Sequence, residues 1–202
     1  DLIFSTSLWL GLVTSTFFST LIIISASQLS LFLLGGENYD NLIRLSAVIL
    51  FFDALSHIPF ALLRLKERSF HFMSIKFLNV VITLGLNIYL VLVKGMGLHG
   101  VFLSLTIAST FTTLAALLTS TNSIHFVISR NLINSLLSFG LPFLPAGFAS
   151  IAMESLDRYI LAGLTDASTV GIYSAGYKLG IFMLLLTTAF QYAWQPFFLK
   201  LG

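Results

Sequence analysis

The chain has 202 residues, of which 57% are hydrophobic and only 9% are charged, and its formal net charge is +2. A soluble domain carries roughly 25% charged residues, so this composition cannot cover a water-facing surface and indicates an integral membrane protein. The small net charge and the lack of a dense basic patch exclude nucleic acid as a partner. The sequence contains no cysteine, which excludes disulfides and thiolate metal sites.

Six apolar segments are long enough to cross a bilayer, which takes about 20 mostly apolar residues. They predict membrane spans near residues 8–34, 42–63, 74–93, 98–118, 140–164 and 171–194. The apolar runs are long and continuous rather than alternating, which predicts an all-α fold, a polytopic membrane helix bundle. The first segment is longer than a bilayer requires, so we expect it to be tilted or to extend beyond the membrane.

The longest connection between spans predicts the domain organisation. Residues 1–121 are expected to be the end of a first helical lobe with four spans. Residues 122–139, which begin in the polar run T-S-T-N-S, are expected to be a cytoplasmic linker and an amphipathic approach. Residues 140–202 are expected to start a second helical lobe with two spans. Because the chain opens without Met and leads directly into a span, we expect an internal fragment of a longer protein.

Lys and Arg near the span ends predict the orientation, because cytoplasmic loops are enriched in these residues. Arg64, Lys66 and Arg68 share one loop, whereas Arg44 and Lys94 stand on the opposite side of the predicted bundle. The basic loop is therefore placed in the cytoplasm.

Charged residues inside the last two spans form the main candidate site. Glu154, Asp157 and Arg158 share much of one helix face, because residues three and four apart are neighbours, and Lys178 lies on the next span. Counted from the predicted helix ends, both cations lie roughly 9 Å deep at 1.5 Å per residue. Charges in hydrocarbon normally face a partner or a wet cavity. The group would hold an anionic head group there, lock the two helices as a salt-bridge cluster, or reach the surface by snorkelling.

A second candidate pair lies in the middle of the second span. Asp53 and His57 are four residues apart there and are followed by Pro59. They would form either a protonatable pair that couples transport to ions, since histidine changes charge near neutral pH, or a local hydrogen bond that hides both groups from lipid. No serine in a G-x-S-x-G turn accompanies them, so a catalytic triad is not supported.

Uncharged polar residues in the other spans allow two interpretations each. The hydroxyls of the first span either line a groove for sugar hydroxyls or bond the carbonyls of their own helix; they include Thr14, Ser15, Ser19, Ser25, Ser27 and Ser30. Asn79 and Asn87 are expected to form hydrogen bonds between helices, with substrate contact as the alternative. The four histidines lack metal-ligand spacing, so neither a metal nor a cofactor is expected.

Two stretches carry a family resemblance. One is P-F-A-L-L-R-L-K-E-R-S-F-H-F-M-S with the later G-M-G-L-H-G-V-F-L-S, and the other is the series G-L-P-F-L-P, D-R-Y-I-L, G-I-Y-S-A-G-Y-K-L and W-Q-P-F-F. In order and spacing they resemble polysaccharide flippases of the O-antigen and capsule type, within the multidrug/oligosaccharidyl-lipid/polysaccharide exporter superfamily. The resemblance implies helices three to eight of a transporter with about 12 to 14 spans in two pseudo-symmetric lobes.

The resemblance also implies a function. Such flippases are not enzymes; they move a polyprenyl-pyrophosphate-linked oligosaccharide across the bacterial inner membrane by alternating access. The implied partners are this lipid-linked oligosaccharide, membrane lipids and polysaccharide assembly proteins. Lys178 lies where the lipid II branch has a cavity arginine in a similar A-D-R-L stretch, which implies a pyrophosphate contact. The acid of that stretch has no counterpart here, because Gly176 and Tyr177 occupy its place.

Three alternatives remain open from the sequence. A cation-coupled multidrug and toxin antiporter of the same fold would rely on acids as its main cavity charges. A membrane-embedded sugar polymerase or acyltransferase would need a catalytic base, for which the Asp53 and His57 pair is the candidate, and a long loop domain. A purely structural membrane subunit would not be expected to carry so many charges within its spans.

Overall fold

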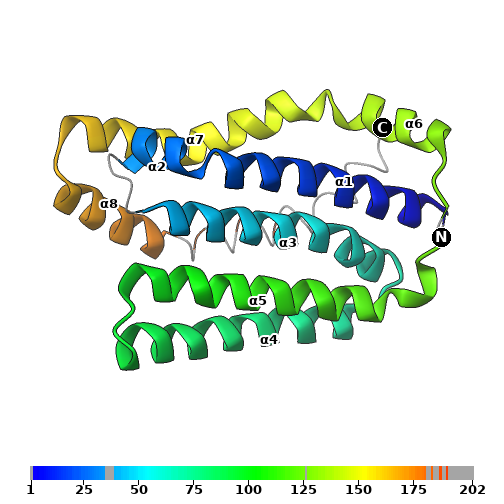
Figure 1. Ribbon diagram of the computed structural model, residues 1–202, viewed down its shortest axis with the longest axis horizontal. Helices are drawn as coiled ribbons and strands as arrows, with labels where there is room; N and C mark the ends of the chain where they lie inside the picture. Colours follow the sequence, from blue (N-terminus) through cyan, green and yellow to red (C-terminus); the bar gives the residue numbers. More distant parts are fainter. Residues whose placement is uncertain are drawn as a thin grey trace. The chain divides into compact units, whose positions relative to one another are not determined.

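The computed structural model describes residues 2–34, 39–125, 127–180, 183, 187 and 190. Within these residues every regular element is a helix (Figure 1), so the predicted all-α class is confirmed. The chain forms two compact units, Asp1–Ser138 (unit 1) and Phe139–Gly202 (unit 2).

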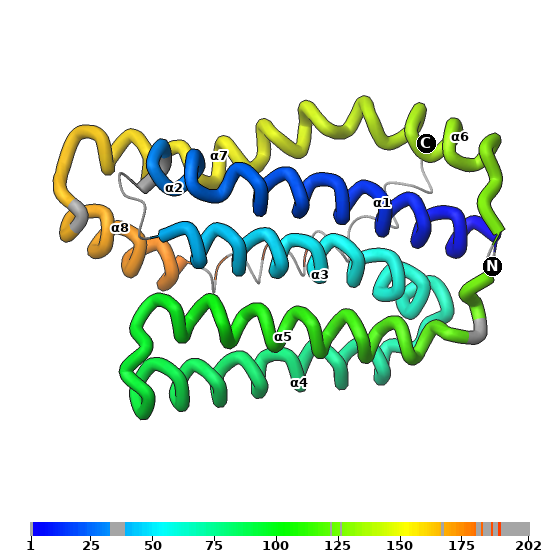
Figure 2. The backbone as a smooth tube through the Cα atoms, viewed as in Figure 1, coloured from blue at the N-terminus to red at the C-terminus, as the bar shows by residue number. Residues whose placement is uncertain are grey.

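Unit 1 is a bundle of long helices that run side by side (Figure 2). Helix α3 packs between α1 and α5, and α4 packs against α5. The helices of this unit are α1 (Leu2–Ile24), α2 (Ala26–Leu34), α3 (Asp40–Leu65), α4 (Ser69–Asn87), a π-helical continuation η2 (Ile88–Val93), α5 (Gly97–Thr119), the short 3-10 helix η3 (Thr121–Ser123) and α6 (Arg130–Gly140), whose last residues belong to unit 2.

In the part of the chain that the structure describes, four helices are long and apolar enough to cross a membrane: α1, α3, α4 with its continuation, and α5. A fifth span results if α6 and the next helix, α7 (Phe143–Leu164), are counted together as one broken span. The amphipathic approach and the fifth span predicted from the sequence correspond to these two helices. Of the sixth predicted span, residues 171–180, 183, 187 and 190 are described, and α8 (Ala167–Leu179) covers its first part.

The first predicted segment is corrected by the structure. Its helix begins at Leu2 rather than near residue 8, and it is interrupted at Ser25 before α2 begins. The predicted start near residue 8 left Ser5 and Thr6 outside the helix. They lie inside it because Ser5 and Thr6 are fully buried and have partners elsewhere in the chain.

Those partners belong to the segment that follows α5. The Ser5 hydroxyl donates to the Ser123 carbonyl oxygen at 3.1 Å and accepts from the His125 amide at 2.9 Å. The indole of Trp9 donates to the carbonyl oxygen of His125, and the Lys66 ammonium donates to the Ser123 hydroxyl at 2.6 Å. The start of the predicted linker is therefore held against α1 and the basic loop after α3.

Hydrogen bonds also join the helices of unit 1 at buried positions. In a bilayer the lipid is as apolar as the helices, so close packing and polar contacts contribute much of their association. Helix α1 donates from the Ser19 hydroxyl to the Ala47 carbonyl oxygen of α3 at 3.0 Å. Helix α5 donates from the Thr113 hydroxyl to the Phe52 carbonyl oxygen of α3 at 2.8 Å. Helix α3 is thereby fixed from two sides.

The two asparagines of the third predicted span join α4 to α5. The Asn79 side-chain amide donates to the Thr112 hydroxyl at 2.7 Å, and the Asn87 side-chain oxygen accepts from the Ser104 hydroxyl at 2.8 Å. The expectation that both asparagines bond between helices is confirmed, although Asn87 is the acceptor of its bond rather than the donor.

Unit 2 contains the hairpin of α7 and α8, which pack against each other. Helix α8 begins after Asp166, whose carboxylate accepts from the Thr169 hydroxyl at 2.5 Å and from the Thr169 amide at 3.3 Å. This is an N-terminal cap, which satisfies an amide that the first helical turn leaves unpaired. The Thr169 hydroxyl bond, with help from the amide, lowers the pKa of Asp166 below its ordinary value.

Candidate functional site

The α7–α8 hairpin places Asp157 against a tyrosine of the facing helix. Its carboxylate accepts from the phenolic hydroxyl of Tyr173 at 2.5 Å, and its second oxygen accepts from the backbone amide of Arg158 at 2.8 Å. Asp157 is half-buried in unit 2. The acid is thus occupied by a phenol and by its own backbone.

Arg158 lies next to this acid but has a different partner. Its guanidinium carbon lies 4.7 Å from the ring centroid of Tyr177, which is a cation–π arrangement. Its Nε is buried without a hydrogen-bond partner. Among the described residues, no acid forms an ion pair with this guanidinium. Arg158 therefore combines a fixed orientation with donors that no described side chain takes up.

The four charged residues predicted for the site have two kinds of surroundings. Asp157 and Arg158 are brought together with tyrosines, whereas Glu154 and Lys178 are exposed and have no ion-pair partner among the described residues. The salt bridge that the Glu154 and Arg158 spacing allowed is not formed. The hairpin is thus not locked by the charge cluster that the sequence left open as an alternative.

The predicted equal depth of the two cations is wrong. Helix α8 begins at Ala167, four residues before the predicted span, because the Asp166 cap starts it there. Lys178 lies 11 residues after that start, while Arg158 lies six residues before the end of α7. At 1.5 Å per residue, Lys178 is roughly 7 Å further from the hairpin turn than Arg158. The two residues therefore leave their helix backbones at different levels, although the Arg158 guanidinium reaches Tyr177, the residue before Lys178.

In unit 1, Asp53 and His57 both point out of the bundle. They are exposed side chains on one face of α3, and no hydrogen bond joins them. The predicted local bond that would hide both groups is therefore absent from this described helix. Asp53 lies at the middle of a 26-residue helix that is apolar enough to span a membrane. Among the described residues, no group of three His, Asp or Glu is placed to hold a metal ion.

The hydroxyls of the first span have two kinds of partner: Thr14 and Ser15 bond their own helix, whereas Ser19 and Ser27 bond residues of α3. Thr14 donates to the carbonyl oxygen of Leu10 at 2.9 Å, and Ser15 donates to that of Gly11 at 2.6 Å. Such i to i−4 bonds are the ordinary way for a hydroxyl to be satisfied in a membrane helix. Both side chains also line an open groove of about 370 Å³ between α1 and α3. Whether sugars use this groove stays a prediction.

Tyr173 and Tyr177 are site residues that the sequence analysis missed. They lie four apart in G-I-Y-S-A-G-Y-K-L, and such residues share a helix face. That spacing, set opposite the D-R pair of the preceding helix, was the available signal. The prediction considered charged residues, and it therefore included Lys178 but not its neighbour Tyr177.

These observations define the class of protein to which the chain belongs. Four helices able to span a membrane, with a fifth if the broken pair is counted, make this a multi-pass membrane protein. Over residues 1–201 the chain matches the model of a family described as polysaccharide biosynthesis protein. The chain belongs to this polysaccharide biosynthesis protein family. No curated protein and no solved structure matches it.

Proposed function

We propose that the protein is part of a flippase that moves a polyprenyl-pyrophosphate-linked oligosaccharide across the bacterial inner membrane by alternating access. The observation that carries the proposal is the state of Arg158: a cation on α7, which forms part of a candidate broken span, oriented by Tyr177 and without an acid partner among the described residues. A charge at that depth needs an anion or water. The family match supports a role in polysaccharide biosynthesis.

Arg158 suits a pyrophosphate for a geometric reason. A guanidinium presents its donors in a planar fork that matches phosphate oxygens, and stacking on an aromatic ring reduces the freedom lost on binding. Lys178, exposed at a different level of the same hairpin, would provide a second cationic contact along the path of the head group. The sugar would meet polar side chains while the polyprenyl tail stays in the bilayer.

Tyr173 has a role in this proposal that does not require contact with substrate. By donating to Asp157 it engages the acid closest in sequence to Arg158. Without that phenol, Asp157 would be able to turn to the guanidinium and neutralise it. Tyr173 is therefore proposed as a positioning residue, which keeps the arginine available to an anion.

The test uses the full-length parent gene, deleted in its host and restored with variants. The measurement is the amount of lipid-linked oligosaccharide on each face of the inner membrane. Arg158→Gln and Lys178→Ala are expected to raise the cytoplasmic share and to reduce surface polysaccharide. For Arg158→Gln the loss should be about ten- to hundred-fold, since hydrogen bonds to a charged group contribute about 1.5–3 kcal/mol. Normal transport by Arg158→Gln would overturn the assignment.

Matched tyrosine variants separate orientation from general packing. Tyr177→Phe keeps the ring beneath the guanidinium and should retain transport, whereas Tyr177→Leu removes the ring and should reduce it. Tyr173→Phe should reduce transport by freeing Asp157, and the double variant Tyr173→Phe with Asp157→Asn should restore it. A double variant no better than Tyr173→Phe alone would refute the role given to Asp157.

The same experiment distinguishes the rival functions. Normal sidedness with shortened or unmodified sugar would indicate an enzyme such as a polymerase or acyltransferase. Transport of cationic drugs that is lost in Asp53→Asn would indicate an antiporter. A flippase predicts build-up of complete oligosaccharide on the cytoplasmic face. Its proposed partners are the lipid-linked oligosaccharide, bilayer lipids and the polysaccharide assembly proteins.

A further inference from the structure

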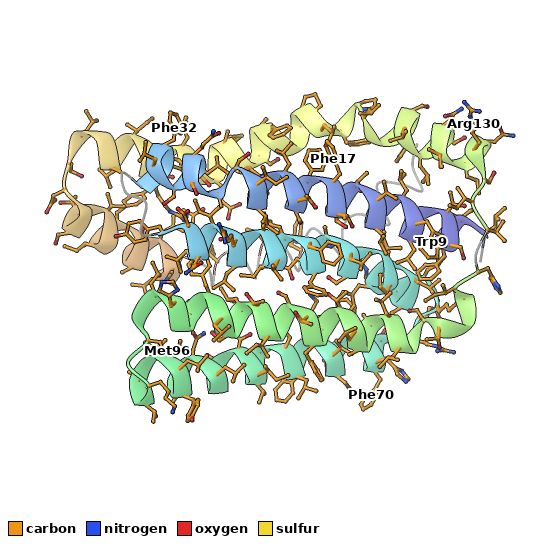
Figure 3. The ribbon with its side chains drawn as sticks, in the orientation of Figure 1. Trp9, Phe17, Phe32, Phe70, Met96 and Arg130 are labelled. Carbon is orange, nitrogen blue, oxygen red and sulfur yellow. The ribbon has the colours of Figure 1, made fainter. Side chains whose placement is uncertain are left out.

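A second polar site lies in unit 1, at the end where α1 finishes and where α3 and α5 begin. An open pocket of about 470 Å³ is formed there by three helices. Its polar lining comes from Asn41, Arg44 and His99, and its apolar lining includes Ile23, Val48 and Leu103. In Figure 3 the label of Met96, which also lines the pocket, marks this end of the bundle.

The polar and apolar residues of the pocket lie at different depths. Arg44 is the fifth residue of α3 and His99 is the third residue of α5, so both lie within about 6 Å of their helix starts at 1.5 Å per residue. Val48 and Leu103 each lie one turn further into the same helices. The pocket thus has a basic rim at the level of the membrane surface and an apolar floor toward the bilayer interior.

The charged residues around this pocket leave Arg44 available to bind an anionic ligand. The acid one turn earlier on α3 is Asp40; its Oδ2 accepts from the Ser27 hydroxyl at 2.5 Å, and its Oδ1 is buried without a hydrogen-bond partner. Among the described residues, Arg44 forms no ion pair. The other cation at this end, Lys94, lies 5.9 Å from the ring of Tyr89 and does not line the pocket.

We propose that this pocket binds the phosphate head group of an anionic bilayer phospholipid, with an acyl chain along its apolar floor. Arginine pairs with phosphate through two parallel bonds, and basic pockets between membrane helices are suited to anionic lipid head groups. The apolar floor favours a lipid over a soluble anion. A pocket of about 270 Å³ elsewhere in unit 1, lined by residues such as Leu8, Leu55 and Leu117, has no cation in its lining and serves as an internal contrast. The site is independent of the substrate proposed above.

The test is native mass spectrometry of the full-length protein purified in detergent and supplied with equal amounts of phosphatidylglycerol and phosphatidylcholine. The wild type is expected to retain phosphatidylglycerol on the order of ten-fold more than phosphatidylcholine, as expected from a charge-assisted pairing. Arg44→Gln should bring the two lipids close to parity. Lys94→Gln removes the same charge from the same end outside the pocket, and it should keep the preference.

Two outcomes would overturn the proposal. One is an unchanged preference in Arg44→Gln, and the other is an equal loss in Lys94→Gln, which would mean unspecific attraction by net charge. Soluble glycerol 3-phosphate, added as a competitor, should not displace the lipid; efficient displacement would identify a soluble anion as the occupant and refute the lipid. If Arg44→Gln unfolds, Leu103→Trp replaces it. That variant fills the apolar floor with the cation intact and should also lower phosphatidylglycerol retention, and a full preference in it would refute the site.

Discussion

Two helices of unit 1, α3 and α4, both span a membrane but expose faces of opposite character. The exposed side chains of α4 include the large apolar residues Phe70, Met73, Phe77, Val81 and Leu84. The exposed cation of that helix, Lys76, rests 4.5 Å from the ring centroid of Phe60. From Asp53 to Arg64 the exposed face of α3 carries small, polar and charged side chains: Asp53, Ala54, His57, Ala61 and Arg64.

This difference in side-chain chemistry distinguishes a face that contacts lipid from a face that contacts water or further protein. Hydrocarbon tolerates phenylalanine and leucine at no cost, so the α4 face suits direct contact with lipid. Hydrocarbon does not tolerate a carboxylate at the centre of a span, so the α3 face suits water or further protein. Exposure by itself does not separate these cases, because both faces carry exposed side chains in the described bundle. The chemistry of the exposed residues does.

The largest effect is expected from placing the same charge on each face. Leu84→Asp introduces a carboxylate near the middle of the span that α4 forms with η2, where the side chain is 58% exposed, and should cost about 2.5–3.5 kcal/mol of insertion free energy. Ala54→Asp places it at the middle of α3 and should be tolerated. The yield of monodisperse, membrane-inserted protein measures both. Equal losses would remove the distinction between the faces.

A ten-fold effect is expected from chemical labelling. These 202 residues contain no cysteine, so single cysteines introduced here can be compared without background from this part of the protein. A water-soluble thiol reagent should modify Ala54→Cys on the order of ten-fold faster than Leu84→Cys, because the reactive thiolate forms only where water reaches the sulfur. Lys178→Cys should also react if the hairpin lines a wet cavity. Resistance at position 178 in the folded protein would exclude that cavity.

A smaller effect is expected on the inner face of α4. The bond from Asn79 to Thr112 should contribute about 0.6 kcal/mol, the average for polar pairs between membrane helices. Asn79→Ala, Thr112→Ala and the double variant, compared by denaturant unfolding in detergent, give the coupling energy. A coupling near zero would mean that α4 is held to α5 by packing alone.

The smallest effect concerns the turn between α7 and α8. Because the folded state lowers the pKa of Asp166, the carboxylate stabilises the hairpin above its unfolded pKa near 3.9. This contribution is lost as the pH falls through the lower folded value. The melting temperature of the wild type should exceed that of Asp166→Ala at pH 7, and the gap should close at acid pH. Asp166→Asn keeps the cap without the charge and should lack this dependence.

Much of the fold follows from the sequence because long apolar runs have one stable solution in a bilayer. The runs near residues 42–63, 74–93 and 98–118 each coincide with a helix of the structure. The amphipathic segment before Gly140 was likewise predictable from its pattern. The start of α1 was misjudged, because the partners of Ser5 lie 118 and 120 residues away along the chain.

The candidate site was predictable only in part. The charges themselves, Asp157, Arg158 and Lys178, are conspicuous in an apolar sequence, and so are Asp53 and His57. Their partners were not predictable, because the contact between Asp157 and Tyr173 depends on the register of two facing helices. That register in turn depends on where Asp166 caps α8, and an error of four residues there shifted the predicted depth of Lys178 by about one turn.

The sequence by itself determined that the chain crosses a membrane as helices, because hydrocarbon requires each backbone amide and carbonyl to be paired within its own segment. Only the tertiary structure decided which helix faces are turned outward and which tyrosine engages which charge. It also decided that Arg44 and His99 line one pocket although they are far apart in the chain. These features depend on side chains from different helices meeting at one place, and no single segment contains that information.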